Sequence, residues 1–265
     1  MKKYIIVAIL CIIPIAAFGW GIGLIGGGGA PAAVDWTQDA DCEAAYLFAD
    51  NLTDECSNYD MTIGAGGPLT YDDTMPGTLN GKMIHFDGSS QYLAAGAGVD
   101  MMTNATDYAI SFWFKMDTNM AEAKAIYSQG SYFFIGFDAN EELMHQVRDT
   151  DDGGGNHFWY NISDFTDSTA AVHVCLSLAA GAPGGDGTGT VYISSTSAFA
   201  DLVDGTTETF VDIEGTSDGT LDSFVASYNG GELFDGSIGQ LLLLRQQLTR
   251  SECSDIWQYG IDGGN

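Results

Sequence analysis

The segment at residues 233–259 most constrains what this chain can fold into. An Asp-Gly turn pair at 235–236 opens a run that is dense in aliphatic residues. Thr249 then stands where a helix N-cap would, with Glu252 three residues later. In this capping-box spacing, each of the two side chains accepts a backbone N–H that the first helical turn leaves unpaired. The segment therefore predicts a long buried strand followed by one short helix, which lays its apolar side, including Ile256, on the sheet.

The middle of the chain shows the alternation that is typical of β-strands. Phe133, Ile135 and Phe137 recur with a period of two, and residues 143–148 and 157–162 repeat the pattern. Turn signals rich in Gly, Asp and Asn separate these runs, at residues 138–140, 149–156 and 181–189. No helical periodicity extends beyond the terminal helix, so the sequence predicts one antiparallel β-sandwich.

The charge of the chain limits the partners that it can bind. Its 36 Asp and Glu residues outnumber its 8 Lys and Arg residues, which gives a net charge of −28. Binding to nucleic acid or to an anionic membrane surface is disfavoured, because neutralising phosphates needs patches of Lys and Arg. Two interpretations of the acidity stay open: solubility in water salty enough to screen the self-repulsion, or binding of cations.

The N-terminus predicts export. Two lysines precede an apolar run at residues 4–18, and Ala17-Phe18-Gly19 fits the small-x-small rule for signal cleavage before Trp20. We therefore expect a signal peptide at residues 1–19, a Gly/Ala-rich linker at 20–35 and one domain at 36–265, secreted or at the cell surface. An uncleaved anchor reaching to about residue 25 is the alternative, and the protein would contact a membrane only in that case.

Five short motifs occur in order along the chain. They are Ala45-Tyr46-Leu47-Phe48 with the loop at 54–58, Phe86-Asp87-Gly88-Ser89, Ile110-Ser111-Phe112-Trp113, Val172-His173-Val174 with 191–193, and Phe234-Asp235-Gly236-Ser237-Ile238. Over roughly residues 36–260 they resemble the hallmarks of the laminin-G-like domains, which are concanavalin A-like lectin folds.

The resemblance implies an all-β fold, an antiparallel β-sandwich jelly roll with one short C-terminal helix, in which the first and last strands pair. It also implies a packed, hydrogen-bonded role for His173. Many members of the family carry an acidic residue early in the last strand, where this chain has Gly239-Gln240. That departure lowers the expectation of a structural ion at this point.

Export places the four cysteines outside the N-terminal segment in an oxidising environment, and four cysteines allow three connectivities. Cys175 lies in the middle of a predicted core strand, so we expect a buried free thiol there. If the first and last strands pair as the resemblance implies, Cys253 can reach Cys42 or Cys56. We predict a Cys56–Cys253 disulfide, and a fold without disulfides is the alternative.

The sequence offers no catalytic constellation that we recognise. A retaining glycosidase needs two carboxylates about 5 Å apart. Glu141 and Glu142 are adjacent, so on a strand they would point to opposite faces. The four histidines never form a close pair. We therefore expect that the protein is not an enzyme.

Two groups of oxygen ligands could hold calcium, the cofactor that such hard donors favour. The first lies in the Gly-rich turn and consists of Asp149, Asp151, Asp152 and Asn156. The second lies near the first strand and consists of Asp54, Asn58 and Asp87. For both groups a solvated turn without a metal is an open alternative.

A strand beside the acidic turn is the candidate for glycan binding, which needs partly exposed aromatic rings with polar neighbours. If Phe158 and Tyr160 face the core, the opposite face carries His157, Trp159 and Asn161, with Gln146 and Arg148 on the preceding strand. The alternative is that Trp159 belongs to the core.

These observations favour an exported, non-catalytic domain that binds a carbohydrate or another surface ligand in adhesion or recognition. A structural or assembly protein of a cell surface, filament or virion, acting through self-association, is the first alternative. A polysaccharide-degrading enzyme is the second.

Overall fold

A computed structural model describes residues 33–56, 59–76, 79, 81–97, 99, 107–117, 124–130, 133–138, 142–148, 155–161, 170–179, 187–195, 203–204, 208–210, 222–228 and 231–264. These residues belong to one compact unit, Ala33–Asn265. Within the described ranges, no helix has the length and apolar character needed to cross a bilayer.

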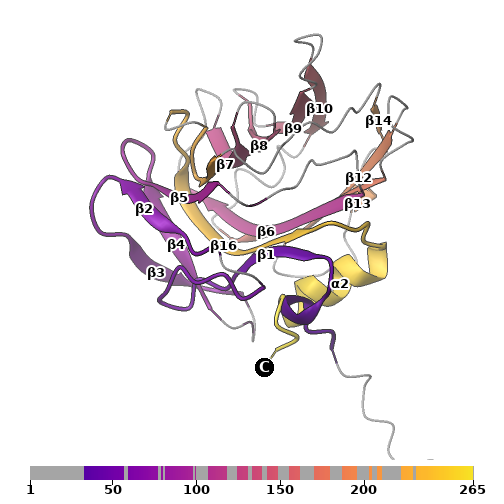
Figure 1. Ribbon diagram of the computed structural model, residues 1–265, viewed down its shortest axis with the longest axis horizontal. Coiled ribbons are helices and arrows are strands. Elements are labelled where there is room, and N and C mark those ends of the chain that lie inside the picture. The colour runs from indigo at the N-terminus through magenta and orange to yellow at the C-terminus, as the bar shows by residue number, and fades with distance from the viewer. Residues whose placement is uncertain are drawn as a thin grey trace, which may run out of the picture. The chain divides into compact units, whose positions relative to one another are not determined.

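Two antiparallel sheets form a sandwich (Figure 1). Sheet A has nine described strands, in the order β13 (Val203–Asp204), β12 (Gly187–Ser195), β11 (Val172–Ala179), β6 (Tyr108–Met116), β16 (Asp235–Leu244), β4 (Lys82–Asp87) and β3 (Thr70–Thr74), with β1 (Cys42–Tyr46) on β16 and β14 (Glu208–Phe210) on β12. Sheet B has seven described strands, in the order β10 (Gly155–Asn161), β9 (Glu142–Arg148), β8 (Phe133–Phe137), β7 (Lys124–Gln129), β15 (Asp222–Val225), β5 (Tyr92–Ala97) and β2 (Thr62–Ala65). The predicted β-sandwich is confirmed.

Strand β16 is the central element of sheet A, as its aliphatic run predicts. It pairs with β6 along one side, and every residue from Gly236 to Leu244 is buried. On its other side the first half pairs with β4 and the second half with β1. The register shifts between Gly239 and Leu241, and Gln240 has a φ of 26°. Such a bulge bends a strand and re-aims it, and it falls where β16 changes partners. The expected pairing of the first and last strands is confirmed.

The core between the sheets is rich in aromatic rings. Phe114 of β6 and Phe137 of β8 join the two layers, with ring centroids 4.9 Å apart. Tyr108 of β6 and Phe133 of β8 make a second contact between the layers, at 5.5 Å. Each fully buried ring of this size contributes about 1.5–3 kcal/mol through the hydrophobic effect. In the described part of the structure, packed side chains therefore occupy the inner faces of both sheets.

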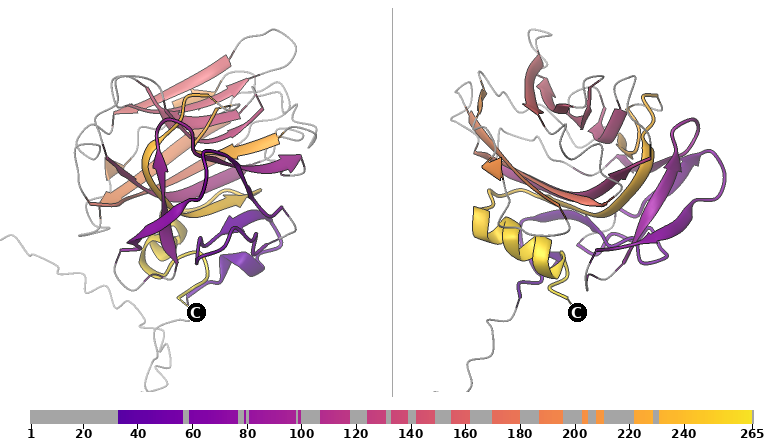
Figure 2. Two further views of the ribbon diagram at one scale, coloured as in Figure 1. Left: turned by 90° about the vertical axis from the view of Figure 1, so that its left-hand side faces the viewer. Right: turned by 180° about the vertical axis from the view of Figure 1, so that it is seen from behind.

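The terminal helix α2 (Arg250–Tyr259) lies on the outer face of sheet A, the side that faces away from sheet B (Figures 1 and 2). The predicted capping box is present, since Thr249 Oγ1 accepts the Glu252 N–H at 3.3 Å and Glu252 Oε2 accepts the Thr249 N–H at 2.6 Å. Cys253 and Ile256 are buried against β1, β6, β11 and β16. A short 3-10 helix, Trp36–Gln38, precedes β1.

Both disulfides differ from the predicted pairing. The structure joins Cys42 to Cys56 and Cys175 to Cys253, with Cα–Cα distances of 5.8 Å and 5.9 Å. The predicted Cys56–Cys253 bond is therefore wrong, and so is the free thiol at Cys175. In β11 the neighbours Val174 and Leu176 pack in the core between the sheets. Because side chains alternate along a strand, Cys175 points to the outer face, where α2 presents Cys253.

Candidate functional site

The register of β9 and β10 brings together the positions predicted to bind a glycan. His157, Trp159 and Asn161 lie opposite Gln146, Met144 and Glu142, and Gly155 lies opposite Arg148. Directly opposite residues of an antiparallel pair share a face, so these positions line one side of the two strands. The side chains of Arg148, His157, Trp159 and Asn161 lie outside the described part of the structure. Gln146 is only 6% exposed. The proposed binding role of all five residues stays a prediction.

The contact that His145 makes shows which face of sheet B carries the predicted glycan-binding positions. Its Nε2 lies 2.8 Å from the hydroxyl of Tyr108 on β6, so its side chain points into the core between the sheets. Gln146, the next residue, therefore belongs to the outer face of sheet B. Burial lowers the pKa of His145 to about 3, so its ring is neutral at physiological pH and packs as part of the core.

Aromatic residues that the sequence analysis did not single out occupy the same outer face. Tyr92 of β5 and Phe224 of β15 are both half-buried and meet edge to face, with centroids 5.9 Å apart. Phe134 of β8 lies directly opposite Gln146, and Tyr228 packs on Phe134 with ring centroids 5.5 Å apart. We call these five residues the sheet B face. Tyr92, Phe224 and Tyr228 are partly exposed, whereas Phe134 and Gln146 are buried. Partly exposed rings are groups that protein sites use to hold sugars.

Asp54, one of the predicted calcium ligands, shapes the loop that follows β1. Its Oδ1 accepts the backbone N–H groups of Ala45 and Cys56 at 2.8 Å and 3.0 Å, and its Oδ2 accepts that of Tyr59 at 3.3 Å. The carboxylate is 4% exposed. These bonds give the Asp54 carboxylate a structural role in the loop. Asn58 lies outside the described residues.

Asp87, its predicted companion, closes the turn after β4. Desolvation would raise the pKa of Asp87, but the N–H groups of Ser89, Ser90 and Gln91 and the hydroxyl of Ser90 bond its carboxylate and bring the pKa well below the usual range. The group therefore stays ionised at physiological pH. Of the acidic turn, Asp149, Asp151 and Asp152 lie outside the described residues, and so does the side chain of Asn156. Calcium binding at either group stays a prediction.

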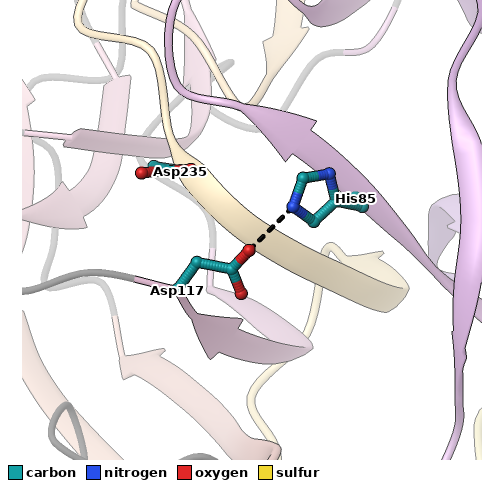
Figure 3. A group of neighbouring side chains, drawn as sticks. All are labelled: His85, Asp117 and Asp235. Carbon is teal, nitrogen blue, oxygen red and sulfur yellow. Dashed lines mark hydrogen bonds and ion pairs between the residues drawn. The ribbon is translucent and has the colours of Figure 1, made fainter.

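A different group of metal-ligand residues comes together on the outer face of sheet A (Figure 3). His85 lies on β4, Asp117 follows β6 directly, and Asp235 begins β16, which runs between the other two strands. One ligand atom of each residue lies within 4.8 Å of those of the other two. His85 Nε2 and Asp117 Oδ2 are 2.7 Å apart, and both side chains are about one third exposed. We call these three residues the His85 cluster.

Sequence reasoning missed the His85 cluster because its members come from three distant segments. Asp235 and the Phe-Asp-Gly motif beside His85 were used only as fold hallmarks. Knowledge of the strand register would have found it, because Ser237 of β16 lies opposite His85 of β4 on one side and Lys115 of β6 on the other.

A buried serine–histidine contact in sheet A is structural. His173 Nε2 lies 2.8 Å from Ser111 Oγ, and its ring packs on Trp113 at 5.1 Å. His173 and Ser111 are at most 1% exposed, and burial lowers the pKa of His173 to about 3. No carboxylate among the described residues bonds its Nδ1. No substrate can reach this serine, and the packed, hydrogen-bonded role expected for His173 is confirmed.

Comparison with known proteins shows the fold and no family. No protein-family model matches the chain, and no curated protein matches it. Among solved structures it resembles domain 4 of AbnA, a GH43 extracellular arabinanase from Geobacillus stearothermophilus, determined in complex with arabinotriose. The TM-score is 0.59 at 19% identity, and the match covers 83% of this chain and 100% of that domain.

Toxin binding domains resemble the chain as well. The binding domain of Paraclostridial Mosquitocidal Protein 1 matches with a TM-score of 0.60 at 14% identity over 84% of this chain. That of botulinum neurotoxin serotype D matches with a TM-score of 0.58 at 11% identity over 81% of this chain. The chain spans about half the length of these two, 52% and 51%. Two of these three structures are named as binding domains, and the third was determined with a bound arabinotriose.

Proposed function

We propose that this chain is an exported, non-catalytic binding domain of the laminin-G-like type that recognises a carbohydrate or another surface ligand. The observation that carries the proposal is the match to the full length of arabinanase domain 4, which was determined with arabinotriose. The signal-like N-terminus supports export, and the two disulfides suit an oxidising environment.

The sheet B face is the surface that we assign to this ligand. Sugar rings present C–H surfaces that pack on aromatic side chains, while their hydroxyls need amide or carboxylate partners. Tyr92 and Phe224 supply partly exposed rings, and the nearly buried amide of Gln146 lies in the register row that continues to His157. Trp159, opposite the half-buried Met144, stands next to that row.

A glycan array followed by calorimetry tests the proposal, with arabinotriose and longer arabinans among the probes. We expect binding that falls about tenfold or more, equivalent to about 1.4 kcal/mol, in Trp159→Ala and in Phe224→Ala. Tyr259→Ala on α2 is the matched control, because it removes a half-buried aromatic ring from the other side of the sandwich. The absence of binding across a broad glycan array would contradict carbohydrate binding. Release of reducing sugar from any polysaccharide would contradict the non-catalytic assignment.

One observation favours self-association as a second function. Strand β2 forms an edge of sheet B, all four of its residues are exposed, and Ile63 is 45% exposed. An exposed edge strand without charged residues is a template for pairing with another chain. Sedimentation of the purified protein separates the two functions, because an assembly protein should form oligomers that Ile63→Lys disrupts, whereas a binding module should stay monomeric.

A further inference from the structure

We propose that the His85 cluster binds a divalent transition-metal ion, with zinc as the ion that its donors fit best. The site lies on the outer face of sheet A and is separate from the sheet B face, so it does not depend on the proposed glycan ligand. Its donors are one imidazole nitrogen and two carboxylates, held by three neighbouring strands.

The positions of the donors are close to those of a metal site. Tetrahedral zinc places nitrogen and oxygen ligands at about 2.0–2.2 Å, which puts the ligands about 3.4 Å from one another. His85 Nε2 and Asp117 Oδ2 stand 2.7 Å apart, and one ligand atom of each residue lies within 4.8 Å of those of the other two. The closest pair must open by about 0.7 Å, and the widest must close by at most about 1.4 Å. Side-chain rotation supplies such shifts without movement of the strands.

The charges around the cluster favour a cation. Asp235 lies directly opposite Asp87 in the ladder between β16 and β4, and like charges in such a pair are destabilising. The Asp87 carboxylate accepts the N–H groups of Ser89 and Ser90, which hold it within its own turn. With Asp117, three carboxylates gather at one end of the sheet, and Lys115 is the lysine nearest to them in the register. A divalent ion would offset the remaining negative charge.

An ordinary ion pair between His85 and Asp117 explains less of the arrangement. Such a pair needs a protonated histidine and one carboxylate, and an exposed pair of this kind contributes little to stability. Both side chains are about one third exposed. The second carboxylate, Asp235, within 4.8 Å of both, is the group that a metal site requires and an ion pair does not.

The donor set also selects the metal. Calcium and magnesium take oxygen ligands, and calcium needs six to eight of them. An imidazole nitrogen suits zinc, copper, iron and nickel, and zinc also accepts carboxylate oxygens. Three protein ligands leave a fourth position of zinc open to water or to an exogenous ligand. The cluster is therefore distinct in chemistry from the calcium sites expected from the acidic turns.

Zinc titration of chelator-treated, dialysed protein tests the proposal. We expect one saturable zinc ion per chain, and a rise of about 5–10 °C in Tm at a hundredfold excess over Kd. His85→Ala, Asp117→Asn and Asp235→Asn should each weaken zinc binding at least about tenfold. Calcium and magnesium at the same concentrations should not raise Tm by binding to the His85 cluster.

Asp50→Asn is the matched control, because it also removes one exposed carboxylate, which pairs with Lys82 at 2.7 Å. It should bind zinc as the unmodified chain does. The proposal is overturned if the unmodified chain binds no zinc, or if His85→Ala binds it equally well, since the ion then lies elsewhere. Calcium binding as tight as zinc binding at these residues would overturn the assigned donor chemistry.

Discussion

The Cys175–Cys253 disulfide should contribute more to stability than any other single covalent feature of the described fold. It joins residues 78 apart in sequence, and the Cys42–Cys56 disulfide joins residues 14 apart. A cross-link stabilises mainly by restricting the unfolded chain, and the effect grows with loop length. For these two loops the restriction amounts to about 4.5 and about 3 kcal/mol at 25 °C. The longer bridge also fixes α2 to β11, so its removal should loosen the helix first.

Guanidinium unfolding of the oxidised protein measures both contributions. Cys175→Ala with Cys253→Ala should lower the free energy of unfolding by about 4.5 kcal/mol, and Cys42→Ala with Cys56→Ala by about 3 kcal/mol. Alanine is the right replacement because Cys175 and Cys253 are fully buried, and serine would place hydroxyls there. The reasoning fails if the first pair costs less than the second, or if reductant leaves the midpoint of the unmodified chain in place.

Three further predictions concern the buried histidines, the helix cap and one glycine. Burial lowers the pKa of His145 and His173 from 6.5 to about 3. Between pH 6.5 and about pH 3 the unfolded chain therefore binds more protons than the folded chain, and the free energy of unfolding falls as the pH is lowered through this range. In urea titrations, His173→Asn should reduce the slope of this fall by up to about 1.4 kcal/mol per pH unit. Thr249→Ala should lower the free energy of unfolding by about 1 kcal/mol, measured in the same titrations, because it removes the capping box. Gly136→Ala should cost about 1–3 kcal/mol in thermal unfolding, because a Cβ there would overlap the Lys124 carbonyl.

The sequence predicted those parts of the fold whose signals are local. The aliphatic run of β16 and the capping box of Thr249 and Glu252 each lie within a few residues, and both formed as expected. The period-two runs likewise became β8 and β9. These signals report which residues are buried along one element. They do not report which outer face a distant element will cover.

The failures follow from that limit. Assigning Cys175 to a disulfide requires knowing that α2 docks on the outer face of sheet A, which no residue near Cys175 indicates. Finding the His85 cluster requires the pairing of β4, β16 and β6, and a shift of one residue in that register would move every side chain to the other face. The ring contact of Tyr92 with Phe224 has the same origin, because β5 and β15 meet only in the folded sheet.

The course of β16 gives the two ends of the outer face of sheet A different surroundings. Its first residue, Asp235, belongs to the His85 cluster, and its last residue, Leu244, is buried beneath α2. The bulge at Gln240 separates these ends, since it is there that the neighbouring strand changes from β4 to β1. The outer face of sheet A is thus occupied by a helix at one end and by a charged cluster at the other. We therefore expect a broad ligand such as a polysaccharide to use the sheet B face, where Tyr92 and Phe224 are partly exposed.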